Sequence, residues 1–99
     1  MLALLLLSIF VATANAETVL VAVASNALAV TRVLADAFTR ASGDDVHLAS
    51  GSTGKLYAQI VNGAPFDLFL AADSERPRQL EAQGLVVDGG RQTYAVGRL

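Results

Sequence analysis

The feature that most constrains the fold is a regular alternation of two kinds of short segment from residue 18 onward. One kind is apolar and rich in β-branched residues, which is typical of a strand buried on both faces. We expect such strands at residues 18–24, 46–50, 66–71 and 93–96. The other kind opens with small polar residues, which is typical of a helix start. We expect helices at residues 27–41, 55–62 and 75–83. This order predicts an α/β fold, a mainly parallel sheet flanked by helices with right-handed crossovers.

The spacing of apolar residues predicts which helix faces turn toward the sheet. In the first helix the apolar residues recur every three to four positions, as expected for a buried stripe. They are Leu28, Val33, Leu34, Ala37 and Phe38. In the second helix, Leu56 and Ile60 form the corresponding face. A short extended piece is expected at residues 85–87, and a turn at residues 88–90.

The first sixteen residues, MLALLLLSIFVATANA, carry no charge and end in the small residues Ala14, Asn15 and Ala16. A short apolar run with an A-x-A ending predicts a signal peptide at residues 1–16, cleaved before Glu17. The run is short for a membrane span, and the alternative is a buried N-terminal strand or helix. The prediction places the mature chain, residues 17–99, in the periplasm.

Charge and cysteine content limit the possible functions. All seven basic and nine acidic residues follow position 16, and the basic residues form no run. A nucleic-acid surface would need clustered basic residues, so no nucleic-acid partner is expected. The chain has no cysteine, so an exported domain of this size must be stabilised by packing alone. Such a small domain is usually part of a larger fold.

Two predicted strand-to-helix loops have the same composition. The first loop, residues 24–26, contains Ser25 and Asn26, and the second loop, residues 51–54, contains Ser52 and Thr53. Ligands of parallel sheets bind beyond the carboxyl ends of the strands, where both loops lie. A helix start offers unpaired N–H groups and a partial positive charge, and hydroxyls add further donors. The two loops therefore predict a site for a small anion; the alternative is that these residues only cap their helices.

The second loop superficially resembles a nucleotide phosphate loop because Gly54 is followed by Lys55. That motif requires a glycine five positions before Gly54 and a hydroxyl residue after the lysine. The positions are occupied by Ala49 and Leu56. Nucleotide binding is therefore excluded, and Lys55 is interpreted as a surface residue.

Other chemistry has little support in the sequence. His47 is the only histidine, so no Ser-His-Asp triad can form, and no cluster has metal-ligand spacing. An enzymatic function would need His47 as a base near Ser25 or Ser52; we interpret it instead as a sheet-surface or capping residue. Asp73 is interpreted as a helix cap and Asp67 as an anchor near the cleft. The arginines are interpreted as solvated surface charges, and they are Arg76, Arg78, Arg91 and Arg98.

Three stretches resemble the periplasmic molybdate-binding proteins of ABC importers, the ModA family. They are VLVAVASN at 19–26, GSTGKLYAQIVNGAPFDLFLAAD at 51–73 and RQTYAVGRL at 91–99. The resemblance implies a two-lobed, periplasmic-binding-protein-like fold of type II that clamps molybdate or tungstate between its lobes. It implies that residues 17–99 form the N-terminal part of lobe 1, with the lobe incomplete in this chain. An inner-membrane ABC permease is the implied partner, and the protein is expected to act as a monomer and not as an enzyme.

The resemblance also implies roles for particular residues. Ser25 matches a hydroxyl ligand, with the N–H of Asn26 beside it, and either Ser52 or Thr53 matches the second hydroxyl ligand. Molybdenum would be bound as molybdate, without a free metal cation or a cofactor. The remaining ligands of the family, including a tyrosine, come from the second lobe. Tyr57 and Tyr94 belong to the first lobe and are not counterparts of that tyrosine.

Two alternatives remain open at this stage. A protein of the same fold could bind another oxyanion or a small organic anion, because the second lobe contributes to the choice of ligand. The chain could also be a truncated, nonfunctional fragment.

Overall fold

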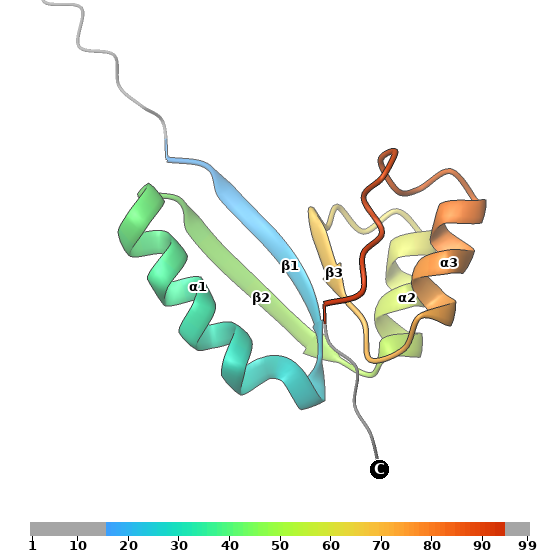
Figure 1. The fold of residues 1–99 in the computed structure, drawn as a ribbon, viewed down its shortest axis with the longest axis horizontal. Coiled ribbons are helices and arrows are strands. Elements are labelled where there is room, and N and C mark those ends of the chain that lie inside the picture. Colours follow the sequence, from blue (N-terminus) through green and yellow to red (C-terminus); the bar gives the residue numbers. More distant parts are fainter. Residues whose placement is uncertain (1–15, 95–99) are drawn as a thin grey trace, which may run out of the picture.

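The computed structural model describes residues 16–94. Strands and helices alternate as expected (Figure 1). The strands are β1 (Thr18–Ala24), β2 (Asp45–Gly51) and β3 (Leu68–Leu70). The helices are a 3-10 turn η1 (Ser25–Ala27) and the α-helices α1 (Leu28–Ser42), α2 (Thr53–Val61) and α3 (Glu75–Ala82). Among these helices, none is both long and apolar enough to cross a membrane.

The three strands form one parallel sheet in the order β2-β1-β3. Figure 1 shows α1 on one side of the sheet, with α2 and α3 together on the other. β1 is followed by β2 on one flank, whereas β2 returns past β1 to β3 on the other flank. Crossovers of the same hand that run in opposite directions place their helices on opposite faces, as the right-handed rule expects. The predicted α/β class, with a parallel sheet flanked by helices, is confirmed.

The core lies around the central strand β1, whose last four residues are buried on both faces. On the α2 and α3 side, Leu56 and Leu80 are also buried, at 1% and 3% exposure. Leu56 was expected to face the sheet, and that expectation is confirmed. The sequence TVLVAVA therefore forms the buried centre of the sheet, as its apolar β-branched pattern predicts.

The prediction for the buried face of α1 is wrong. Val33, Leu34 and Phe38 are 69%, 63% and 46% exposed, Ala37 is also exposed, and Leu28 is half-buried. The buried residue of the helix is Thr31, whose hydroxyl is satisfied by donating to the Ala27 carbonyl at 2.7 Å. Helical periodicity identifies an apolar stripe but not the surface that covers it. In α1 that stripe turns away from β1 and β2.

The third strand is shorter than the predicted 66–71 because Asp67 joins the sheet in another way. Its backbone N–H donates to the Leu20 carbonyl and its carboxylate accepts from the Leu20 N–H, both at 2.8 Å. Asp67 is therefore an anchor, as predicted. However, it lies at the amino end of β3 and not near the cleft edge, where the strands end.

The segment after α3 also differs from expectation. Residues 85–87 are irregular rather than extended, and Gly90 closes the predicted turn by donating to the Val87 carbonyl at 2.9 Å. Residues 93 and 94 are not in a strand, and the rest of the predicted strand at 93–96 lies outside the described residues. The Tyr94 hydroxyl donates to the Ala71 carbonyl at 3.2 Å, which brings this segment back to the end of β3.

Replacing Asp67 with alanine should lower the free energy of unfolding by about 1 kcal/mol, because the Leu20 N–H loses its acceptor. Urea unfolding measures this change. Asp67→Asn is the matched control, since its amide oxygen can still accept the bond and should restore most of the loss. An alanine variant as stable as the parent would contradict the anchoring role.

Candidate anion-binding site

The register of the sheet brings the two candidate loops together. Ala24, the last residue of β1, is paired with Gly51, the last residue of β2. Ser25 and Ser52 directly follow this pair, so each begins its connection at the same edge of the sheet. Neighbouring strands lie about 4.8 Å apart, which makes the two serines neighbours across adjacent strand ends. The predicted proximity of the two loops is thus present in the fold.

Ser25 and Asn26 do not cap a helix, contrary to prediction. They lie in η1 with exposed side chains, and α1 begins only at Leu28 with Ala27 as its N-cap residue. No side chain caps the start of either η1 or α1. The 3-10 turn separates the serine from the α-helix by a full turn, which is a common arrangement at helix starts. The capping-only explanation therefore fails for this loop, and its donors face solvent at the sheet edge.

The second loop is built differently. Ser52 is a true N-cap: its hydroxyl oxygen accepts from the Lys55 N–H at 3.2 Å. The Thr53 hydroxyl oxygen accepts from the Ala72 N–H at 3.0 Å, which ties the start of α2 to the connection after β3. A hydroxyl that accepts one bond still has its own proton to donate. Both hydroxyls can therefore serve as donors to an anion while holding the loop in place.

The electrostatics of this edge favour an anion. Each helix start concentrates partial positive charge from its free N–H groups. Of the described elements, η1, α1 and α2 carry no acidic residue in their first turn. No carboxylate on these three turns opposes an anion bound between Ser25 and Ser52.

The sequence profile of the bacterial extracellular solute-binding proteins matches residues 19–99. The chain belongs to this family. It is 49% identical to the molybdate-binding protein ModA of Azotobacter vinelandii over 86 residues, covering 87% of this chain and 34% of that protein. It is 42% identical to ModA of Rhodobacter capsulatus with the same coverage. The chain spans about a third of the length of the curated relatives it matches. The resemblance noted in the sequence is confirmed.

Solved structures agree with this assignment. The periplasmic molybdate-binding protein of Azotobacter vinelandii superposes with a TM-score of 0.70 at 42% identity, over 72% of this chain and 31% of that protein. The substrate-binding domain of a proposed molybdenum ABC transporter from Clostridium difficile superposes with a TM-score of 0.72 at 21% identity. The superposition covers 75% of this chain and 33% of that chain. The second similarity concerns the fold alone.

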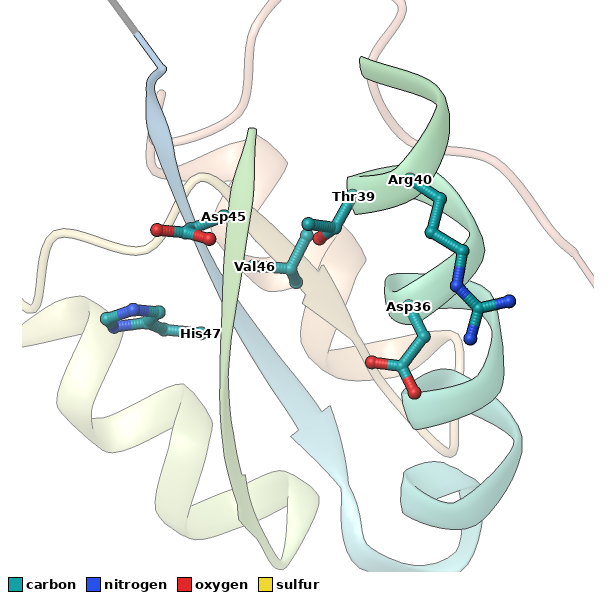
Figure 2. A pocket seen from close by; sticks show the side chains of 6 residues that line it. All are labelled: Asp36, Thr39, Arg40, Asp45, Val46 and His47. Carbon is teal, nitrogen blue, oxygen red and sulfur yellow. The ribbon is translucent and has the colours of Figure 1, made fainter. Parts of the chain in front are cut away.

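His47 lies away from the two candidate loops. It is exposed in the middle of β2, paired with Leu20, four residues or about 13 Å before Gly51. It lines a shallow pocket with residues of α1 and β2, where Figure 2 shows it on the opposite side of β2 from Val46. The interpretation as a sheet-surface residue is confirmed. From there His47 cannot act as a base for Ser25 or Ser52.

The remaining polar residues include several that sequence reasoning misjudged. Tyr57 accepts from the Gln83 side chain at 2.8 Å, within the contact between α2 and α3. Arg91 pairs with Glu81 at 3.2 Å, and Arg76 is half-buried over the Tyr57 ring, so neither is simply solvated. These pairs join residues 10 to 26 positions apart, a separation at which local patterns carry no signal. Asp73, whose carboxylate accepts from the Arg76 N–H at 3.0 Å, does cap α3 as predicted.

Proposed function

We propose that this chain forms part of the ligand-binding lobe of a periplasmic protein that captures molybdate or tungstate for an ABC importer. The observation that carries the proposal is the paired ends of β1 and β2, which set two hydroxyl-bearing helix starts side by side. The relatives named molybdate-binding proteins, at 42–49% identity, support the choice of ligand.

In this proposal a tetrahedral oxyanion receives hydrogen bonds from the Ser25 hydroxyl, the Asn26 N–H and the second loop. Ser52 is the preferred hydroxyl there, because it directly follows the residue paired with Ala24. Thr53 adds its backbone N–H and holds the loop through Ala72. A site made only of donors disfavours protonated phosphate, whose O–H would face another donor, and a cavity sized for molybdate holds the smaller sulfate loosely. Neither a cofactor nor a free metal cation is required.

The same proposal assigns residues 1–16 to a signal peptide and residues 17–99 to the N-terminal part of lobe 1. The mature protein would act as a monomer in the periplasm and deliver its ligand to an inner-membrane permease. The signal-peptide assignment is tested by expressing the full chain in a bacterial host and measuring the mass of the periplasmic product. A product that begins at Glu17 is expected, whereas retention of residues 1–16 would contradict it.

The ligand is tested in a graft, in which residues 17–99 replace the matching third of the Azotobacter vinelandii protein. Calorimetric titration with molybdate and then sulfate should give tight molybdate binding that excess sulfate does not displace. Equal affinity for the two anions would favour a binding protein for another oxyanion. A folded graft that binds neither anion, although the unmodified Azotobacter protein does, would favour the nonfunctional alternative.

Replacing His47 with alanine should leave the molybdate affinity of the graft unchanged within about twofold, because the side chain is exposed and far from the loops. The same calorimetric titration measures this. A large loss of affinity, or a hydrolytic activity that disappears in the variant, would support the enzyme reading instead.

A further inference from the structure

Arg76 is held in a fixed position beside the second loop. It lies in the first turn of α3, half-buried, with its guanidinium carbon 4.9 Å from the centre of the Tyr57 ring. One guanidinium nitrogen donates to the Gln79 side chain at 3.2 Å. The other terminal nitrogen lies 3.9 Å from the point that a Cβ of Gly54 would occupy. Gly54 follows Thr53 in the first turn of α2, so a positive charge is anchored next to the proposed anion site.

Charged side chains surround Arg76 at the starts of α2 and α3. The start of α3 also carries the carboxylates of Asp73 and Glu75, one bonded to the Arg76 N–H and the other to the Gln79 side chain. Lys55 lies on the other side, where its side chain would meet a Cβ at Gly51 at 3.7 Å. Arg76 and Lys55 are thus positive charges beside the start of α2, and Arg76 lies next to the carboxylates of Asp73 and Glu75 at the start of α3.

We propose that Arg76 determines specificity for charge, so that the site prefers doubly charged tetrahedral anions to singly charged anions of the same shape. This inference rests on the proposed function, since it concerns the same anion. The guanidinium acts through its field rather than as a ligand, because stacking on Tyr57 and the bond to Gln79 hold it in the contact between α2 and α3. Coulomb attraction doubles from a monoanion to a dianion. Two unit charges about 4 Å apart in water attract by about 1 kcal/mol, so a charge held beside the site without direct contact changes affinity by a few-fold.

The test compares molybdate with perrhenate, a tetrahedral monoanion of similar size. The full chain, recovered from the periplasm of a bacterial host, is titrated with each anion while the backbone amide signals of residues 25–26 and 52–54 are followed by NMR. Arg76→Gln should weaken molybdate binding about three- to tenfold at low ionic strength and perrhenate binding by about the square root of that factor. The difference should shrink in concentrated salt, because screening shortens the reach of the charge.

Two further variants separate charge from structure. Arg76→Lys keeps the positive charge but not the planar stack, and should retain most of the preference for molybdate. Arg40→Gln removes an exposed charge in the last turn of α1, at the opposite end of that helix from Ser25, and should change neither affinity by as much.

Three outcomes would overturn the proposed role of Arg76. An equal, salt-independent loss of both anions in Arg76→Gln, without rescue by Arg76→Lys, would assign Arg76 a structural role and overturn the inference. Equal effects of Arg76→Gln and Arg40→Gln would mean that only the net charge of the protein matters, which would overturn the specific role of Arg76. If the unsubstituted chain binds neither anion although its NMR spectrum shows a folded protein, the inference is overturned for this chain, whereas the proposed function is decided separately by the titration of the graft.

Discussion

Replacing Leu56 with alanine is expected to lower the free energy of unfolding by about 2–5 kcal/mol, the usual range for a leucine truncated in a core. Leu56 is 1% exposed and is among the largest fully buried side chains of the described residues. It lies in α2, which contacts both β1 and β2, so its loss opens a cavity against the centre of the sheet. A loss of this size is comparable to the whole stability of many small domains.

Leu34→Ala is the matched control, since it is the same substitution in a helix at a site that is 63% exposed. It should change the free energy of unfolding by about 0.5 kcal/mol or less. Urea unfolding of both variants, monitored by circular dichroism, gives the comparison. Equal losses would mean that the outer face of α1 is covered in solution, which would contradict the exposure described for this helix.

Removing the hydroxyls of Ser25 and Ser52 should have the largest effect on function. A hydrogen bond to a charged group contributes about 1.5–3 kcal/mol, so each serine-to-alanine change in the graft should weaken molybdate binding about 10- to 100-fold. Ser52→Ala should also cost about 1 kcal/mol of stability, because it removes the N-cap of α2. Ser25 caps no helix, so Ser25→Ala should leave stability nearly unchanged.

Two controls make this prediction specific. Ser42→Ala removes a hydroxyl that bonds the Phe38 carbonyl at the far end of α1 and should not affect binding. Thr53→Val removes the acceptor for the Ala72 N–H and should weaken binding less than Ser52→Ala does. The opposite order would make Thr53 the hydroxyl ligand, and unchanged affinity in both single serine variants would contradict the site.

Local patterns were sufficient to predict the elements that build the site. The apolar run at residues 18–24 and the Gly-Ser-Thr-Gly loop each have a local physical cause, namely burial on both faces and the preference for hydroxyls at helix starts. The alternation of strands with helices along the chain then predicted a parallel sheet, and in such a sheet both loops must emerge at one edge. This is why Ser25 and Ser52 could be paired in advance.

Features that depend on distant partners could not be predicted. The apolar stripe of α1 turns away from β1 and β2, and the buried residue of this helix is Thr31 instead. The shortened β3 depends on Asp67 reaching Leu20 across 47 residues. The position of Arg76 depends on the packing of α3 against α2, which no residue spacing encodes.

The central claim is that the starts of η1 and α2 bind one oxyanion together. A crystal structure of the graft grown with molybdate tests it most directly, since molybdenum scatters X-rays anomalously and can be located without interpretation of the protein density. We predict an anomalous peak between the two loops, with the hydroxyls of Ser25 and Ser52 about 2.5–3.0 Å from oxyanion oxygens. A peak that lies elsewhere, or that touches only one loop, would contradict this account.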